Sequence, residues 1–344
     1  MRPVSLLKVP LLFLFFVELQ IVASSVASAQ ENGKLRVAFW NFENFFDPFV
    51  DSTRVYNEFT ENGGQHWTKS RFYKKRNNVY KAILAISENE PLAVLGIAEI
   101  ENRYVLHSLF DLTPLKKHNY RFIHYEGDDK RGIDVAMAYC IDKLQLTYTE
   151  PVKVRNPGNK DYRTRDILYA KFYDRRGDTI HVFVNHWPSR YGGERETVKL
   201  RALAAKTLRH KVDSLVFLNQ TIPKIIIMGD FNDTPDDPSI KEILCRDELL
   251  VNLFTDVRKL GFDGTLKHQY SWQVFDQIIV SKSLTDNEKG LLYKNNSAQI
   301  FHGDFLFEKD ESFGGVKLFR TYVGPKYFGG YSDHLPVCID LIFR

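Results

Sequence analysis

The chain has 344 residues, of which 44% are hydrophobic and 26% are charged, and this balance excludes a disordered or fibrous protein. The formal charge of +4 is too small to indicate by itself a nucleic-acid-binding protein. The three cysteines, Cys140, Cys245 and Cys338, are too few for a disulfide scaffold and allow one bridge at most.

Residues 1–29 have the pattern of a secretory signal peptide. Arg2 and Lys8 give a positive start, residues 9–17 are almost wholly apolar, and Ala27-Ser28-Ala29 offers a small-residue cleavage site. The apolar run is too short to span a bilayer, so we expect no stable membrane anchor. We therefore expect cleavage after Ala29 and an exported protein, either periplasmic or secreted.

Strands are predicted by apolar alternation or by short apolar runs. Residues 35–41 alternate in hydropathy, and a polar loop rich in Asp, Asn, Gly and Thr follows over 47–70. Residues 91–98 form an apolar run of the kind that is buried on both faces of a sheet. Further strands are expected over 121–124, 133–140, 166–173, 179–186, 224–229 and 274–280, with a last strand ending at Phe343.

Two helices are predicted from apolar residues spaced three and four apart. The first spans about 70–87, with its lysines, Lys75 among them, mostly off the apolar face. The second spans about 194–218, with Val198, Leu208 and Val212 on one face. Strands alternating with helices indicate a layered α/β protein.

The segment Gly229-Asp230-Phe231-Asn232 ends the apolar run of residues 224–228. Residues just past the carboxyl end of a buried strand point into the crevice where α/β sheets bind ligands. Asp230 can position a water or a metal ion, and Asn232 can donate a hydrogen bond to an oxyanion. The alternative is a strand that simply ends in an Asx turn before Pro235.

Similar polar residues end other predicted strands or lie within them. These residues are Asn41, Glu99, His186, Asp276, Asp333 and His334. If they converge with Asp230, several carboxylates share one pocket, and they raise one another's pKa unless a cation neutralises them. Oxygen ligands of this kind favour Mg²⁺, Mn²⁺ or Ca²⁺. Two nearby histidines suit acid/base chemistry, so the pattern points to metal-assisted hydrolysis of a phosphate ester.

Five ordered motifs give the chain a specific resemblance. They are Asn41 after a strand, Glu99 in Gly96-Ile97-Ala98-Glu99, His186, Gly229-Asp230-Phe231-Asn232 and Ser332-Asp333-His334-Leu335-Pro336-Val337. With Asp276 between the last two, they resemble the endonuclease/exonuclease/phosphatase superfamily over about residues 34–343. Arg131-Gly132-Ile133-Asp134-Val135 and two further segments are similar to a bacterial exported branch of that superfamily. The resemblance implies a single domain over residues 30–344, a four-layer α/β sandwich of two stacked mixed β-sheets flanked by helices.

The resemblance also implies a metal site. Glu99 matches the principal metal-ligating glutamate, and Asp333 matches a further carboxylate of the metal site. Asn41 matches an asparagine near the metal and phosphate, and Glu43 falls where some members place a second acidic ligand. Ala98 departs from the pattern, because the family usually has glutamine before its metal-binding glutamate.

The catalytic residues implied by the resemblance surround this metal. Asp230 matches the aspartate that orients or deprotonates the attacking water, and Asn232 matches the asparagine that contacts the scissile phosphate. His334 matches the histidine that meets the phosphate, with Asp276 as its orienting partner. His186 matches a second histidine of the deoxyribonuclease and 5-phosphatase branches.

Four further residues are assigned less directly. We expect Arg131, Arg165 and Arg190 to bind substrate phosphates, although each could equally be a solvated loop arginine. Asp134 lies inside an apolar strand, which is unusual for an unpaired acid. It could orient His186.

These observations predict an exported, divalent-metal-dependent phosphodiesterase, a nuclease acting on DNA or RNA as a monomer. One alternative is a phosphomonoesterase or lipid phosphodiesterase on the same scaffold, acting on inositol polyphosphates or sphingomyelin. Another is a catalytically inert binding module, which the full set of acids, amides and histidines disfavours. The natural substrate is left open by the sequence.

Overall fold

The computed structural model of the protein describes residues 33–49, 56–88, 90–286 and 289–344. The expected signal peptide and its cleavage site lie outside the described residues. Within the described ranges, no helix combines the length and the apolar character that a membrane span requires.

The first of two large sheets has seven strands. They are β1 (Leu35–Phe45), β2 (Val94–Ile100), β3 (Tyr120–His124), β4 (Asp134–Cys140), β13 (Leu291–Tyr293), β14 (Gln299–Ile300) and β19 (Val337–Phe343). Their order is β13-β19-β1-β2-β4-β3, with β14 also paired to β19. Only β1 and β2 run parallel among these pairs of described strands, so the sheet is mixed.

The second large sheet has six strands in the order β5-β6-β7-β8-β12-β9. They are β5 (Leu144–Val152), β6 (Ile167–Asp174), β7 (Thr179–His186), β8 (Lys224–Asp230), β9 (Leu250–Asn252) and β12 (Asp276–Ser281). β7 and β8 form its parallel pair. Three two-stranded hairpins lie outside the large sheets: β10 (Leu266–His268) with β11 (Ser271–Gln273), β15 (Phe307–Lys309) with β16 (Val316–Leu318), and β17 (Tyr322–Val323) with β18 (Lys326–Tyr327).

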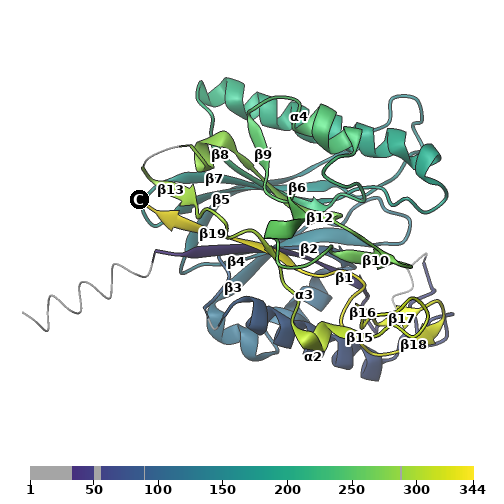
Figure 1. The fold of residues 1–344 in the computed structure, drawn as a ribbon. Coiled ribbons are helices and arrows are strands. Elements are labelled where there is room, and N and C mark those ends of the chain that lie inside the picture. The colour runs from purple at the N-terminus through teal and green to yellow at the C-terminus, as the bar shows by residue number, and fades with distance from the viewer. Residues whose placement is uncertain (1–32, 50–55, 89, 287–288) are drawn as a thin grey trace, which may run out of the picture.

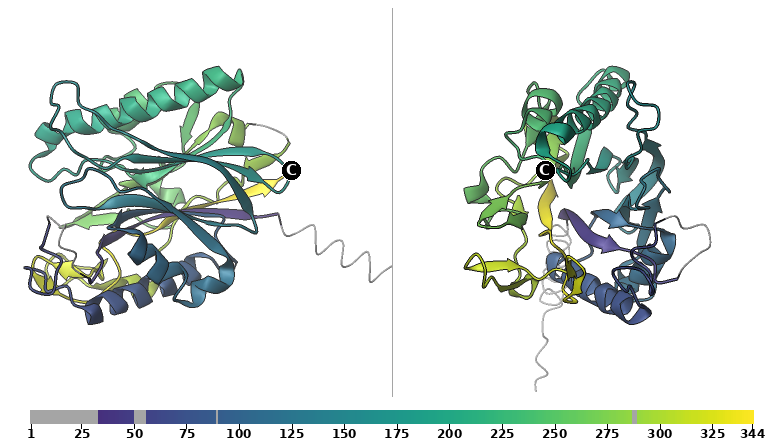
Figure 2. Two further views of the ribbon diagram at one scale, coloured as in Figure 1. Left: turned by 180° about the vertical axis from the view of Figure 1, so that it is seen from behind. Right: turned by 90° about the vertical axis from the view of Figure 1, so that its right-hand side faces the viewer.

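Helices cover the outer faces of both sheets. α2 (Lys69–Ile86) and α3 (Arg103–Phe110) lie on the first sheet, and α4 (Glu194–Asn219) lies on the second (Figures 1 and 2). The order of layers is helix, sheet, sheet, helix, and the predicted four-layer α/β sandwich is confirmed. Short helical turns complete the described chain: η1 (Pro114–His118), η2 (Ser239–Leu244), η3 (Val257–Lys259), η4 (Lys282–Leu284) and η5 (Asp304–Leu306).

The predicted bounds of α2 are confirmed, but the prediction for one of its lysines is wrong. The helix begins after Thr68, whose hydroxyl accepts a hydrogen bond from the N–H of Arg71. Lys75 is buried with Phe72 and Val79 rather than solvated. The physical reason is its position three residues after Phe72 and four before Val79, which places it on the buried face of the helix.

α4 also has the predicted bounds, and its buried face includes two arginines. Arg201 donates from Nε to Asp233 at 2.6 Å, and Arg209 donates to Asp247. Pairing offsets the cost of burying these charges. Val198, expected on the apolar face, is instead exposed, because it lies near the amino end of the helix.

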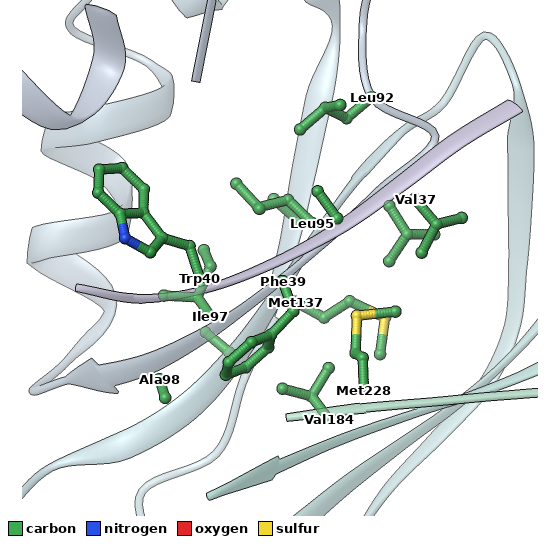
Figure 3. Close-up of a cluster of buried hydrophobic side chains, with 14 of the residues drawn as sticks. Val37, Phe39, Trp40, Leu92, Leu95, Ile97, Ala98, Met137, Val184 and Met228 are labelled. Carbon is green, nitrogen blue, oxygen red and sulfur yellow. The ribbon is translucent and has the colours of Figure 1, made fainter. Parts of the chain in front are cut away.

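The core fills the space between the two sheets. Figure 3 shows Phe39 and Met137 of the first sheet beside Val184 and Met228 of the second. The sheets approach closely at Gly96, where an added Cβ would lie 2.6 Å from the sulfur of Met228. Glycine is therefore needed at this position for the two sheets to pack at this distance.

The three cysteines are free, and Cys140 and Cys338 are buried as the sequence predicts. Burial raises the pKa of the Cys338 thiol to about 11 and that of the Cys245 thiol to about 12. Both thiols are therefore protonated at neutral pH and unreactive.

The strand register brings residues of five strands together. Asn41 of β1 lies opposite Ala98 of β2 in the first sheet. In the second sheet, Asp230 of β8 lies opposite both His186 of β7 and Asp276 of β12. The polar residues predicted at strand ends consequently meet at one end of the sandwich.

We expect Asp340→Asn to destabilise the fold by about 3 kcal/mol at pH 7, since it breaks a buried ion pair. Arg36 of β1 faces Asp340 of β19, with Nε–Oδ1 at 2.7 Å and Nη2–Oδ2 at 3.1 Å. Burial alone would raise the pKa of Asp340, but Arg36 outweighs it and holds that pKa below the ordinary value. The stability that this ion pair contributes is therefore present above the unfolded pKa of Asp340, about 4, and is lost as pH falls through its lower folded pKa.

Urea unfolding of the wild type and the variant at pH 7 and near pH 3 measures this difference. Glu311→Gln is the control, because Glu311 pairs with Lys309 on the surface and both side chains are exposed. Its effect should stay below about 0.5 kcal/mol. An Asp340→Asn penalty that did not shrink in acid would contradict the assignment.

Candidate active site

The carboxylate of Asp230 lies where the two sheets meet. Asp230 ends β8 and is only 2% exposed. From the other sheet, Asn41 Nδ2 donates to Asp230 Oδ2 at 3.1 Å, and the Asn232 N–H donates to Oδ1 at 3.0 Å. Burial raises the pKa of Asp230 to about 7, against the lowering effect of the nearby His334 charge. The group is thus a buried base that two hydrogen bonds hold in place.

His334 and Asp276 form a hydrogen-bonded pair beside Asp230. His334 Nδ1 lies 2.7 Å from Asp276 Oδ2, and its Nε2 lies 3.8 Å from Asp230 Oδ2. Trp40 Nε1 donates to the carbonyl oxygen of His334 at 2.8 Å, which fixes the backbone. Burial alone would lower the pKa of His334, but Asp276 and Asp230 together raise it well above its usual value. His334 is therefore protonated at neutral pH.

His186 lies on the other side of Asp230 and, unlike the protonated His334, is neutral. Its Nε2 lies 3.6 Å from Asp230 Oδ2 and 3.8 Å from Glu99 Oε1. Burial, reinforced by Arg165 and Arg131, lowers the pKa of His186 well below its usual value. A neutral and a protonated imidazole thus flank one carboxylate, and such separation of pKa values is a mark of acid/base sites.

The resemblance assigns a divalent cation to Glu99 and Asp333, and both carboxylates lie at this end of the sandwich, although the described residues here whose donor atoms all lie within 4.8 Å of one another are Asp230, Asp276 and His334. Glu99 Oε2 accepts from the Asn44 N–H at 2.7 Å, and Asp333 Oδ2 accepts from Arg320 at 2.8 Å. The second oxygens lie toward the histidines, Glu99 Oε1 at 3.8 Å from His186 and Asp333 Oδ1 at 4.0 Å from His334. These oxygen donors fit a hard divalent cation, which would also offset their charge.

The backbone is strained at four residues of this end of the sandwich. Glu43, Asn44, Glu99 and Asn232 all have φ between 51° and 62°, in the left-handed region. The pairings of β1 and β2 with their neighbours shift register at the same places. Strain of this kind, held by surrounding structure, is concentrated at functional sites in proteins.

Asn41 and Glu43 do not lie free to bind a metal. Asn41 Oδ1 accepts from the Glu43 N–H at 2.9 Å while its amide nitrogen holds Asp230. Glu43 accepts from the Thr321 N–H at 2.6 Å and from Arg320 Nε at 3.2 Å, and it lies 3.7 Å from Lys75 Nζ. The oxygens of both residues accept hydrogen bonds from protein donors, and their role as metal ligands stays a prediction.

Of the three arginines predicted to bind substrate, Arg165 and Arg190 form hydrogen bonds with other residues of the protein. Arg165 is buried and donates to Asp129 and to the carbonyl oxygen of Trp187. Arg190 donates to the carbonyl oxygen of Asn232 and to the carboxylates of Glu194, Asp233 and Asp237. These guanidinium groups hold neighbouring segments together, and their binding of substrate stays a prediction. Arg131 is partly exposed, with Nε 3.8 Å from Asp129, and it stays a candidate for substrate binding.

Asp134 does not orient His186. Its Oδ2 lies 3.3 Å from Nε2 of another histidine, His124, and its Oδ1 accepts from the Gly127 N–H. This part of the prediction was wrong because Asp134 begins β4, in the sheet opposite the one that carries His186. Among the described residues, His186 Nδ1 has no hydrogen-bond partner.

The sequence analysis missed a charge network behind Asp333, in which Lys75 and Glu43 are buried and Arg320 is partly exposed. Arg320 donates to both Asp333 and Glu43, and Glu43 in turn faces Lys75. The Lys75 ammonium also donates to the hydroxyl of Thr321 and to the carbonyl oxygen of Tyr331. Helical spacing could have identified Lys75. No local signal identifies Arg320, which comes from an irregular segment far along the chain.

The chain matches the Endonuclease/Exonuclease/phosphatase family over residues 36–342, and it therefore belongs to that family. This is the class of fold whose hydrolases act on phosphoesters, and the resemblance noted in the sequence is confirmed. No curated protein matches the chain in sequence.

Solved structures with the same fold share little sequence with the chain. An endonuclease/exonuclease/phosphatase family protein from Bacteroides thetaiotaomicron has a TM-score of 0.58 at 16% identity, covering 90% of this chain and 98% of that one. A mannosyl-6-phosphatase from the same organism has a TM-score of 0.58 at 17% identity, with 90% and 100% covered. The D. rerio TDP2 in complex with a single-strand DNA product has a TM-score of 0.54 at 14% identity, with 90% and 98% covered.

We expect Lys75→Met to cost about 3 to 5 kcal/mol of stability, because it leaves the buried Glu43 carboxylate without its ammonium partner. Lys74→Met is the matched control on the exposed face of the same helix and should change stability by less than about 0.5 kcal/mol. Chemical denaturation measures both. Equal effects of the two substitutions would show that Lys75 does not neutralise Glu43.

Proposed function

We propose that the protein is an exported, divalent-metal-dependent phosphoesterase that hydrolyses nucleic-acid phosphodiesters. The observation that carries the reaction class is the buried Asp230 carboxylate between a neutral His186 and a protonated His334. Export rests on the signal-like pattern of residues 1–29 alone.

Each side chain has a role that follows from its position. Asp230 is held at two oxygens and can orient a water for attack on phosphorus and accept its proton. Protonated His334, oriented by Asp276, stabilises negative charge on the phosphoryl oxygens. A divalent cation bound by Glu99 and Asp333 would supply further neutralisation of the phosphate charge.

A pocket with four cationic lining residues favours an extended polyanion as the substrate. Its volume is about 610 Å³, and these residues are Lys153, Arg155, Lys160 and Arg163. Asp128 and Asp166 also line it, and both pair with Lys153. Arg165, which lies in sequence between the lining residues Thr164 and Asp166, donates to the Trp187 carbonyl oxygen that also accepts from Asn232. Phosphates flanking the cleaved bond would find cations there.

A second pocket has Asp333 of the site in its lining. It has a volume of about 440 Å³, and its lining also includes Phe313 and the cations Lys267, Lys317 and Arg320. Phe313 packs edge-on against the exposed Tyr270, with ring centroids 4.9 Å apart. Aromatic and cationic side chains beside Asp333 suit a flexible single strand, whose bases stack while its phosphates pair.

A phosphomonoesterase is the second candidate function. It is favoured by the similarity in fold to the mannosyl-6-phosphatase, because the same catalytic residues can act on a terminal phosphate. A lipid phosphodiesterase would use the apolar pocket near Asp333 for the non-phosphate part of its substrate. Activity toward the different substrate classes separates these functions.

We expect Asp230→Asn to lower kcat by about 10² to 10⁴-fold, since the amide cannot accept the proton of the attacking water. The fold should be as stable as the wild type or more so, because an uncharged amide is cheaper to bury. Steady-state kinetics and thermal unfolding test both statements. Asp286→Asn is the matched control, as Asp286 is exposed beside Lys282, and it should keep full activity. Undiminished turnover by Asp230→Asn would refute the proposed role.

We expect chelation by EDTA to abolish hydrolysis and Mg²⁺ or Mn²⁺ to restore it. The restored enzyme is then assayed on single-stranded and duplex DNA, RNA, inositol polyphosphates, a sugar monophosphate and sphingomyelin. Preferential cleavage of single-stranded nucleic acid supports the proposal. Faster release of phosphate from the sugar monophosphate would favour the phosphatase instead, and activity that survives chelation would exclude metal dependence.

A further inference from the structure

A second cluster of metal-binding side chains lies on the hairpin formed by β3 and β4. His124 ends β3, Asp134 begins β4, and Glu126 lies in the connecting loop. One nitrogen of His124 and one oxygen from each carboxylate all lie within 4.8 Å of one another. In the described part of the chain, the hydrogen bonds and ion pairs of these three residues include none to the catalytic residues proposed above.

His124 is buried without the hydrogen bonds that a buried imidazole needs. Its side chain is 1% exposed, yet neither ring nitrogen has a hydrogen-bond partner among the described residues. A buried polar group without a partner costs roughly 1–3 kcal/mol. Buried polar groups in native proteins are nearly always satisfied, so an unsatisfied one calls for a partner such as a bound ion. Each ring nitrogen of His124 faces a carboxylate, Nε2 that of Asp134 and Nδ1 that of Glu126, at ion-pair distance but without a hydrogen bond.

The spacing of the cluster can accommodate a metal ion. One ion can bond to only one nitrogen of His124, and one nitrogen and one oxygen from each carboxylate lie within 4.8 Å of one another. His124 Nε2 lies 3.3 Å from Asp134 Oδ2, which is the edge of a tetrahedron whose corners lie about 2.0–2.1 Å from its centre, the distance of zinc to nitrogen and oxygen ligands. Glu126, whose Oε1 lies 3.7 Å from the other nitrogen, Nδ1, has an exposed side chain that can turn toward the same ion.

Asp134 is oriented toward this centre. Its Oδ1 accepts from the Gly127 N–H at 3.1 Å, which leaves Oδ2 directed at His124. Gly127 is needed for this contact, because an added Cβ would lie 2.4 Å from Asp134 Oδ1. Metal sites characteristically orient a ligating carboxylate by a hydrogen bond to it, as the Gly127 N–H does here for Asp134.

The charges of the cluster also call for a cation. The carboxylates of Asp134 and Glu126 both lie against His124, at 3.3 Å and 3.7 Å from its ring nitrogens. Two carboxylates therefore share one imidazole. The Glu126 side chain is 71% exposed, which gives an ion a path from solvent.

We propose that His124, Glu126 and Asp134 bind a divalent transition-metal ion of the zinc class, separate from the catalytic metal. One imidazole nitrogen and two carboxylate oxygens form a donor set that favours Zn²⁺ over Mg²⁺ or Ca²⁺. Water would complete the coordination. The ion would tie the loop over residues 125–133 to the ends of β3 and β4. That loop carries Asp129, which pairs with Arg165 beside the catalytic end.

The site is tested by locating zinc in crystals of the full chain. The protein is stripped with EDTA, crystallised and soaked in ZnCl₂, and anomalous maps are collected above and below the zinc edge. We expect an edge-specific peak bonded to His124, Glu126 and Asp134, whether or not a second peak lies at Glu99 and Asp333. Zinc only at the catalytic end, or at neither place, would overturn the proposal and leave the cluster as an ion pair.

Zinc titration in solution gives an independent test. We expect calorimetry to show that Glu126→Gln loses one zinc site or binds there at least about tenfold more weakly, as even residues behind metal ligands cause such losses. This substitution changes an exposed side chain and should not prevent folding. Glu311→Gln is the matched control at an exposed glutamate and should bind zinc like the wild type. The same stoichiometry and affinity in all three proteins would contradict the proposal, and hydrolysis need not be measured.

Discussion

The packing of one carboxylate between two sheets determines the chemistry of this protein. Asp230 ends a strand of the second sheet, and the amide of Asn41 reaches it from the first sheet at 3.1 Å. Taking a carboxylate out of water is costly, and only hydrogen bonds and nearby cations make it tolerable. The same burial that destabilises the charge raises its pKa to about 7 and makes it a base of useful strength.

The charges around Asp230 fall into two groups with different tasks. His186 and His334 flank the carboxylate directly and can exchange protons with a substrate or water. Behind them, Lys75 and Arg320 neutralise Glu43 and hold Asp333 in place. Burial of this second group costs free energy that a purely apolar core would avoid. Its position beside the site suggests that the network is kept because it fixes the direction of Asp333.

The sequence predicts those parts of the site that depend on local pattern. Apolar runs located most strands of the two large sheets, and the polar residue that ends each run, such as Glu99 or Asp230, was found by that rule alone. The runs did not locate β5, β9, β13 or β14. The partners of the arginines could not be found in this way. Arg165 and Arg190 look like loop arginines in sequence, and only the tertiary fold brings their guanidinium groups to Asp129 and Asn232. Predictions failed where a side chain has several possible charged partners, because the choice among them is made by packing.

Lys75 and His124 show that tertiary partners also cannot be predicted for residues within helices and strands. Both lie in segments whose type was predicted correctly, and both are buried polar groups whose partners come from elsewhere in the chain. Lys75 finds Glu43 and is satisfied, whereas His124 faces two carboxylates and no hydrogen-bond partner in the described residues. Buried polar groups in native proteins are nearly always hydrogen-bonded. The two ring nitrogens of His124, which lack hydrogen bonds, therefore favour an ion bound between His124, Glu126 and Asp134.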